Sequence, residues 1–88
     1  MNSAIYEVKL KHSAQKEVKS LAAEVRGRVI SILRTLSDNP RPYGCRKLVG
    51  AKNRWRVRVG DYRVIYTIDD SFHLVEIIAV RHRSKAYD

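Results

Sequence analysis

Cysteine is almost absent from this sequence: Cys45 stands alone among 88 residues, so no disulfide can form within the chain. Long apolar runs are also missing, and no segment approaches the roughly 18 apolar residues that a membrane-spanning helix needs. The first residues, MNSAIYEVKLKHS, contain no apolar stretch of the kind found in a signal peptide. These absences predict a cytoplasmic protein that does not contact a membrane.

Acidic residues are the second shortage. Nine Asp and Glu stand against 18 Lys and Arg, which gives a formal net charge of +9 at pH 7. An excess of this size predicts attraction to a polyanion such as a nucleic acid. A charge that serves only solubility is the alternative.

The length predicts a single domain over residues 1–88. A chain this short buries roughly 60% of its unfolded surface, enough for one modest core and too little for a large internal cavity. Hydrophobic residues make up 44% of the chain, which indicates a folded globule.

The N-terminal part predicts a strand followed by a helical hairpin. Residues 4–10, AIYEVKL, combine alternation with β-favouring side chains and are predicted to be a strand. Ser13 is the predicted N-cap of the first helix, and the break between the two helices is expected at residues 22–24. The apolar residues at helical spacing are Ala14, Val18 and Leu21, then Val25, Val29, Ile32 and Leu36.

Proline is rare, and both prolines follow the second predicted helix. Pro40 disfavours helical geometry in its predecessor, so this helix should end by Asn39. Residues 38–53 are predicted to be an ordered basic loop. Its expected apolar anchors are Tyr43, Leu48 and Val49.

The C-terminal part predicts three strands, over residues 54–59, 62–68 and 73–81, with turns at Gly60-Asp61 and around Asp70-Ser71. The order is strand, helix, helix, strand, strand, strand. It predicts an α+β fold in which the last three strands form an antiparallel meander within one sheet and the helices pack on one face.

The first predicted hairpin, RWRVRVGDYRVIY, has a register that follows from its turn. If Gly60 and Asp61 form a two-residue type II′ turn, Arg58 lies opposite Arg63, and paired residues share one face of the sheet. The apolar face carries Trp55, Val57, Val59, Tyr62, Val64 and Tyr66, and the other face carries Arg54, Arg56, Arg58 and Arg63.

Placing two arginines opposite each other costs some tenths of a kcal/mol up to about 1 kcal/mol. The guanidinium fork suits phosphate, which it holds through two hydrogen bonds at once. We therefore interpret the arginine face as a phosphate-binding surface, with an ordinary solvated sheet face as the alternative.

A two-residue turn at Asp70-Ser71 is predicted to lead into the third strand. That register continues a row from Arg56 through Ile65 to Glu76, so Glu76 is a candidate to hold arginine side chains in position, with a structural ion pair as the favoured alternative. It also puts Ile78, Val80 and His82 on the arginine side.

The chain ends AVRHRSKAYD, a cluster of basic residues with a terminal aromatic. His82 is the first candidate for proton transfer, because histidine changes charge near neutral pH. Its alternative role is to cap the strand through a hydrogen bond. Tyr87 is a candidate to stack on a base or to donate from its hydroxyl.

Three motifs in order, NPRPYGCRKLVG, WRVRVGDYRVIYTI and VRHRSKAY, resemble the RelE family of the RelE/ParE toxin superfamily, from Ile5 to Tyr87. The resemblance implies a toxin of a type II toxin–antitoxin system, an endoribonuclease that cuts messenger RNA in the ribosomal A site. It also implies that the enzyme uses no metal or other cofactor, has the ribosome and messenger RNA as partners, and is neutralised by a cognate antitoxin.

The resemblance also supplies candidate catalytic residues by position: Arg56, Arg58, Arg63, Arg81, Arg83 and Tyr87. His82 completes the set of candidates on the chemistry given above. The expected reaction is attack of the ribose 2′-hydroxyl on the adjacent phosphate. Arg56 and Arg58 stand where the best-known members often have lysines, and arginine stays protonated, so they should hold the phosphate rather than act as a base. Further contacts to RNA or the ribosome are expected from Arg46, Lys47, Lys52 and Arg54.

Two other functions are compatible with the sequence. ParE-type toxins share the fold and poison DNA gyrase, and a non-catalytic RNA-binding module needs only basic strands and aromatic residues. The ending RHRSKAY favours the ribonuclease.

Overall fold

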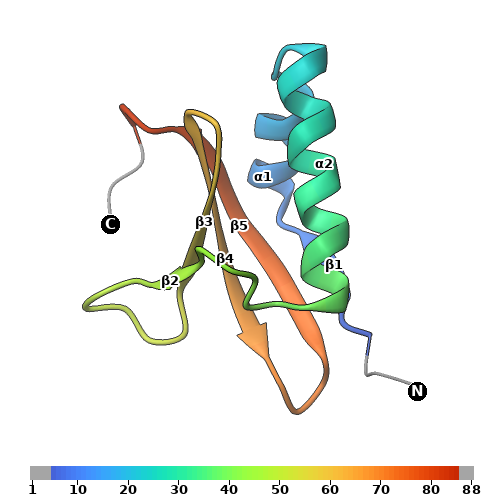
Figure 1. Cartoon of the computed structure of the whole chain (residues 1–88), viewed down its shortest axis with the longest axis vertical. Helices are drawn as coiled ribbons and strands as arrows, with labels where there is room; N and C mark the ends of the chain where they lie inside the picture. Colours follow the sequence, from blue (N-terminus) through green and yellow to red (C-terminus); the bar gives the residue numbers. More distant parts are fainter. Residues whose placement is uncertain (1–4, 86–88) are drawn as a thin grey trace.

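A computed structural model of the chain describes residues 5–85 and shows two helices packed on one face of a five-stranded sheet (Figure 1). The strand order is β1-β5-β4-β3-β2, in which β1 runs parallel to β5 and every other neighbouring pair is antiparallel. The predicted α+β fold is therefore confirmed. The elements are β1 (Glu7–Leu10), α1 (His12–Lys19), α2 (Ala23–Asp38), β2 (Arg46–Lys47), β3 (Trp55–Val59), β4 (Tyr62–Asp69) and β5 (Leu74–His82). Among residues 5–85, neither helix has the length and apolar character to cross a membrane.

The start of α1 differs from the prediction, whereas the end of α2 agrees with it. The prediction that Ser13 is the N-cap of α1 is wrong. The helix begins at His12, and Lys11 occupies the N-cap position. The backbone N–H of Lys11 donates to the carbonyl of Ile77 on β5, so strand pairing decides where the extended chain ends. The end of α2 at Asp38 confirms the effect expected of Pro40.

The core lies between the helices and the inner face of the sheet. The predicted apolar spacing is borne out, since Ala14 and Val18 of α1 are buried, as are Val29 and Leu36 of α2. The sheet contributes Val57, Val59, Val64, Tyr66, Ile68, Val75, Ile77 and Val80.

The β3–β4 hairpin has the predicted register. Val59 pairs with Tyr62, and Arg58 with Arg63. Gly60 has φ +60°, a left-handed conformation that other residues adopt only with strain, and Asp61 has a negative φ, as a type II′ turn requires.

The predicted register between β4 and β5 is wrong. Asp69 pairs with Leu74, so four residues, 70–73, make the connection, and His73 adopts φ +51°. The register then shifts, because Ile65 pairs with Ala79 while Tyr66 pairs with Ile77, which leaves Ile78 as an extra residue.

This bulge decides which β5 side chains face the helices. Residues 77 and 80 lie three positions apart, yet both are buried in the core, which a regular two-residue alternation forbids. As a result, Val80 and His82 lie on the inner face rather than with the arginines. The four-residue connection, rather than the bulge, pairs Glu76 with Thr67 instead of extending the row from Arg56.

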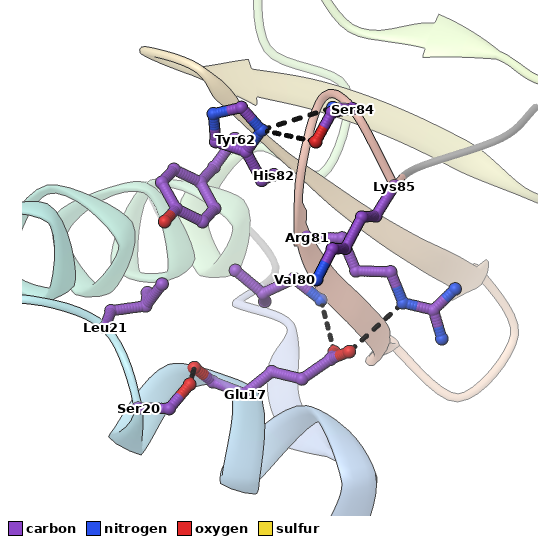
Figure 2. A pocket seen from close by; sticks show the side chains of 9 residues that line it. All are labelled: Glu17, Ser20, Leu21, Tyr62, Val80, Arg81, His82, Ser84 and Lys85. Atoms are coloured by element: carbon purple, nitrogen blue, oxygen red, sulfur yellow. Dashed lines mark hydrogen bonds and ion pairs between the residues drawn. The ribbon is translucent and has the colours of Figure 1, made fainter.

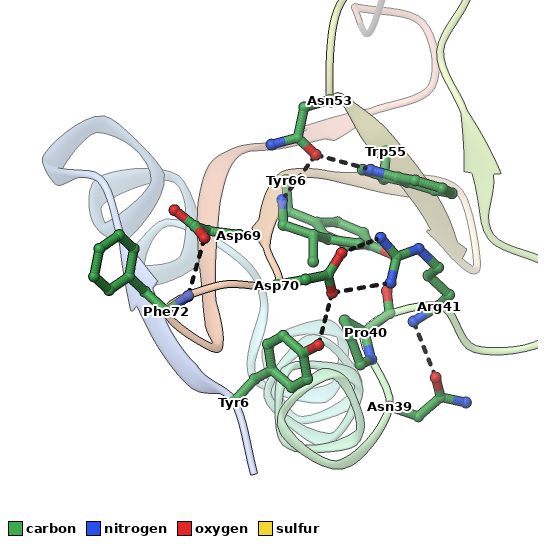
Figure 3. Close-up of polar contacts among 11 residues, drawn as sticks. Tyr6, Asn39, Pro40, Arg41, Asn53, Trp55, Tyr66, Asp69, Asp70 and Phe72 are labelled. Atoms are coloured by element: carbon green, nitrogen blue, oxygen red, sulfur yellow. Dashed lines mark hydrogen bonds and ion pairs between the residues drawn. The ribbon is translucent and has the colours of Figure 1, made fainter. Parts of the chain in front are cut away.

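Of the three apolar anchors predicted for loop 38–53, only Leu48 is partly buried. Tyr43 and Val49 are fully exposed, and β2 forms within the loop by pairing with β3. The loop is held instead by Arg41, whose guanidinium donates to both oxygens of Asp70 (2.9 and 3.3 Å) and lies 4.8 Å from the centre of the Trp55 ring (Figure 3).

Asp70 therefore links three segments, because it also accepts a 2.6 Å hydrogen bond from the hydroxyl of Tyr6 (Figure 3). The hydrogen bonds from Arg41 and then from Tyr6 lower the pKa of Asp70 to about 2. A carboxylate with a depressed folded-state pKa stabilises the fold above its unfolded pKa, near 3.9, and that contribution is lost as the pH falls toward 2.

We expect Asp70→Asn to lower the urea midpoint of unfolding near neutral pH and to lose this disadvantage between about pH 4 and pH 2. Urea titrations of both proteins across this range measure the effect. Asp69→Asn is the matched control, because its hydrogen bond from the Phe72 N–H suits an amide oxygen equally well. A difference that stays constant down to pH 2 would contradict the role given to Asp70.

Candidate functional site

Three arginines surround a small hollow at the tip of the β3–β4 hairpin. The hollow has a volume of about 170 Å³ and is called here the arginine hollow; its lining residues are Arg58, Gly60, Asp61, Tyr62, Arg63 and Arg83. The end of β5 reaches the turn because the backbone N–H of Arg83 donates to the carbonyl of Asp61 at 2.7 Å. The Arg83 Nε also lies 3.9 Å from the carboxylate of Asp61.

The arginine hollow has the chemistry of an anion site. Arg58 and Arg83 are exposed, so their charge is open to a ligand from solvent, and Arg63 lies half-buried beside them. Among the described residues that line the hollow, Asp61 is the one acidic residue beside three arginines. A bound phosphate would reduce the repulsion between neighbouring guanidinium groups. The backbones of Arg58 and Arg63 are fixed by β3 and β4, and that of Arg83 by its hydrogen bond to Asp61, so the hollow can stabilise negative charge that grows on a reacting phosphate.

The backbone of Arg81 pairs with that of Arg63, but the Arg81 side chain does not line the arginine hollow. Its Nε donates to Oε2 of Glu17 on α1 at 3.1 Å (Figure 2). Both residues line a hollow of about 610 Å³ beside the outer edge of β5, called here the edge hollow. The edge hollow is lined by Glu17, Ser20, Leu21, Tyr62, Val80, Arg81, His82, Ser84 and Lys85.

His82 lies on the inner face of the sheet, opposite the face that carries Arg58 and Arg63. Its ring packs edge-on against Tyr62, with 5.3 Å between ring centres. The backbone N–H of Ser84 donates to His82 Nδ1 at 3.2 Å, and the Ser84 hydroxyl lies 2.9 Å from the same nitrogen (Figure 2). The structure therefore does not bring His82 together with these arginines, and its contacts are those of a residue that closes the last turn.

The other basic residues that were predicted to contact RNA lie near β2, the strand at the opposite edge of the sheet from β1. Arg56 was predicted to face solvent but is only 7% exposed, because it occupies an inner strand between Arg46 of β2 and Ile65 of β4. Arg46, Lys47 and Arg56 line a hollow of about 430 Å³ together with Leu48 and Val49. Lys52 and Arg54 are exposed in the loop before β3, and Tyr87 lies outside the described residues.

Sequence reasoning missed Glu17 and Asp61 as members of these hollows. Glu17 precedes Arg81 by 64 positions, and no spacing rule links an acid on a helix to a strand that far away. Asp61 could have been found from the sequence, because the predicted Gly60-Asp61 turn places it beside Arg58 and Arg63. Over residues 5–85, no three His, Cys, Asp or Glu side chains gather in a way that could hold a metal ion.

Comparisons with known proteins agree in sequence and in fold. Residues 8–87 match the family model described as the ParE toxin of the type II toxin–antitoxin system parDE. The toxin RelE of Mycobacterium tuberculosis is 31% identical over 83 residues, which are 93% of this chain and 86% of that protein.

Solved structures of RelE–RelB complexes contain similar chains. The archaeal complex from Pyrococcus horikoshii OT3 matches with a TM-score of 0.81 and 29% identity, over 93% of this chain and 99% of that chain. The intact Escherichia coli RelBE toxin–antitoxin complex matches with a TM-score of 0.78 and 26% identity, over 94% and 99%.

Proposed function

This chain belongs to the RelE/ParE toxin superfamily as a RelE-type toxin of a type II toxin–antitoxin system, and on that premise we propose that it cuts messenger RNA in the ribosomal A site. The observation that carries the proposal is the arginine hollow, where Arg58, Arg63 and Arg83 meet at the hairpin tip. A ribonuclease must neutralise a phosphodiester during its reaction, and fixed guanidinium groups serve that purpose.

The proposed reaction uses the RNA's own 2′-hydroxyl. Its oxygen forms a bond to the adjacent phosphorus as its proton leaves, and the bond from phosphorus to the 5′-oxygen breaks as that oxygen gains a proton. The products are a 2′,3′-cyclic phosphate and a free 5′-hydroxyl, and no metal takes part. Arg58, Arg63 and Arg83 hold the non-bridging oxygens and stabilise their growing charge.

The general base is not one of the arginines, because a guanidinium stays protonated in proteins. Much of the acceleration must then come from charge stabilisation and from the geometry that the ribosome imposes on the messenger. We therefore expect weak cleavage of free RNA and strong cleavage on translating ribosomes.

The other basic residues extend the proposed contact surface. Arg46, Lys47, Lys52 and Arg54 are assigned to backbone phosphates of messenger or ribosomal RNA. The family resemblance adds Arg56, Arg81 and Tyr87 to the site. The net charge of +9 suits an acidic cognate antitoxin as the neutralising partner.

One experiment tests the proposed function. The toxin is added to translating ribosomes, and the 5′ ends of the messenger are mapped. Cuts in phase with codons support the ribonuclease. Intact messenger together with inhibited supercoiling by DNA gyrase would support the alternative that the family model's ParE description raises. RNA binding with neither effect would indicate a non-catalytic module.

His82→Asn should change the rate of ribosomal cleavage only a few-fold. Loss of a general base costs about a hundred- to ten-thousand-fold, but the His82 ring faces away from Arg58 and Arg63 and accepts a hydrogen bond from Ser84. His12→Asn, on the exposed start of α1, is the matched control. A loss of a hundred-fold or more in His82→Asn alone would identify His82 as the base.

A further inference from the structure

Glu17 has two bonds to β5, one to the backbone and one to a side chain. Its Oε1 accepts a 2.8 Å hydrogen bond from the backbone N–H of Val80, and its Oε2 accepts the 3.1 Å bond from Arg81 Nε (Figure 2). The Glu17 side chain is 29% exposed, so this carboxylate is fixed by the backbone and partly shielded from solvent. Such a pair is stronger than an ordinary surface salt bridge.

The position of Glu17 follows from the short length of β1. That strand pairs with residues 74–77 of β5, and α1 lies along the remainder of the β5 edge. The Val80 N–H on this edge needs an acceptor, and the Glu17 carboxylate supplies it. Glu17 thus reaches Arg81 because it is already bound to the neighbouring residue.

The arginine hollow offers the Arg81 guanidinium a second binding position. Its backbone lies opposite Arg63, whose side chain lines the arginine hollow with Arg58 and Arg83. In the free protein a further guanidinium in that hollow would be repelled by the exposed guanidinium groups of Arg58 and Arg83, whereas Glu17 attracts it. A bound phosphate reverses this balance, most strongly when its negative charge grows in the transition state.

We propose that Glu17 is a built-in restraint that holds Arg81 away from the arginine hollow in the free toxin, and that RNA phosphate displaces Glu17 as the partner of Arg81. The inference rests on the proposed function, since it takes RNA as the ligand of the hollow. Glu17 is a positioning residue that tunes affinity for RNA through Arg81.

The test measures binding of the full chain to a single-stranded RNA whose 2′-hydroxyls are methylated, so that cleavage cannot occur. Glu17→Gln keeps an oxygen for the Val80 N–H but removes the charge that holds Arg81. We expect binding to be tighter by about two- to five-fold, the worth of one partly exposed ion pair. The log–log salt slope should stay close to that of the wild-type protein, because Arg81 contacts phosphate in both complexes. Fluorescence anisotropy over a salt series gives both quantities.

Glu7→Gln is the matched control, because it makes the same change in net charge on β1, which pairs with the opposite end of β5 from Arg81. It should leave the affinity close to that of the wild-type protein. Glu17→Gln should add nothing when Arg81 is already replaced by glutamine. Equal or weaker binding by Glu17→Gln, including no binding by either protein, overturns the proposal, as does a gain that survives without Arg81.

A second readout separates this proposal from the proposed function. The NMR signal of the Arg81 Nε–H should move on RNA addition, away from its position in the Glu17-bonded free protein. If that signal stays in place at saturating RNA, the restraint is wrong even when ribosomes are cut. If the signal moves but messenger on ribosomes stays intact, the restraint stands and the ribonuclease assignment fails.

Discussion

Arg63→Ala should lower ribosomal messenger cleavage by about a hundred-fold or more while the protein remains folded. Arg63 lies on β4 beside Arg58 in the register, and both line the arginine hollow. Removing one preorganised donor to a developing oxyanion costs about a hundred- to a thousand-fold in rate. Cleavage is measured by messenger 5′ ends over time on translating ribosomes.

Two further variants sharpen this prediction. Arg63→Lys retains the charge but loses the planar fork, so it should recover part of the lost rate. Arg34→Ala removes the same charge from the exposed side of α2 and should cut at close to the wild-type rate. Urea unfolding of each variant shows whether the fold is intact. A folded Arg63→Ala protein that cuts at the wild-type rate would remove the arginine hollow from the mechanism.

Tyr66→Ala should produce the largest loss of stability among the changes considered. Tyr66 has no exposed surface, and its hydroxyl donates a 2.8 Å hydrogen bond to the carbonyl of Pro40 (Figure 3). Burial raises the pKa of this hydroxyl well above its usual range, so it remains a donor at neutral pH. Truncating a buried ring to alanine costs about 3–5 kcal/mol of unfolding free energy.

A domain of this size has a total stability of roughly 4–13 kcal/mol, so the alanine variant is expected to lie close to unfolding. Tyr66→Phe keeps the ring and leaves the Pro40 carbonyl unpaired, which should cost about 1–3 kcal/mol. Tyr43→Ala, at a fully exposed position, should change stability by less than about 0.5 kcal/mol. Urea titrations measure all three, and a phenylalanine variant as unstable as the alanine variant would contradict the assigned role of the ring.

The confirmed predictions all depend on neighbours close in sequence. Gly60 can adopt the positive φ of a type II′ turn, and this single turn sets every pair from Val59 and Tyr62 outward. Pro40 ends α2 through its effect on the preceding residue. In each case the deciding atoms are covalently near, so the residues themselves carry the information.

The wrong predictions concern contacts between distant segments. The bulge at Ile78 allows Ile77 and Val80 both to be buried in the core, which a regular two-residue alternation does not allow. The two-residue strand β2 has too few residues to show a period, yet its pairing helps to bury Arg56. His82 lies on the inner face of the sheet, and not on the predicted arginine face, as a consequence of the same bulge.

The sequence by itself therefore determined the α+β order of elements, the β3–β4 register and the crowding of arginines on one face, because turn geometry and alternation act over a few residues. Only the tertiary structure decided that Arg83 joins Arg58 and Arg63 and that Arg81 meets Glu17. Packing of α1 against the β5 edge brought Glu17 to Arg81, and the contact between the end of β5 and the hairpin turn brought Arg83 to Arg58 and Arg63. These juxtapositions join residues up to 64 positions apart, and such contacts form only when the sheet closes against the helices.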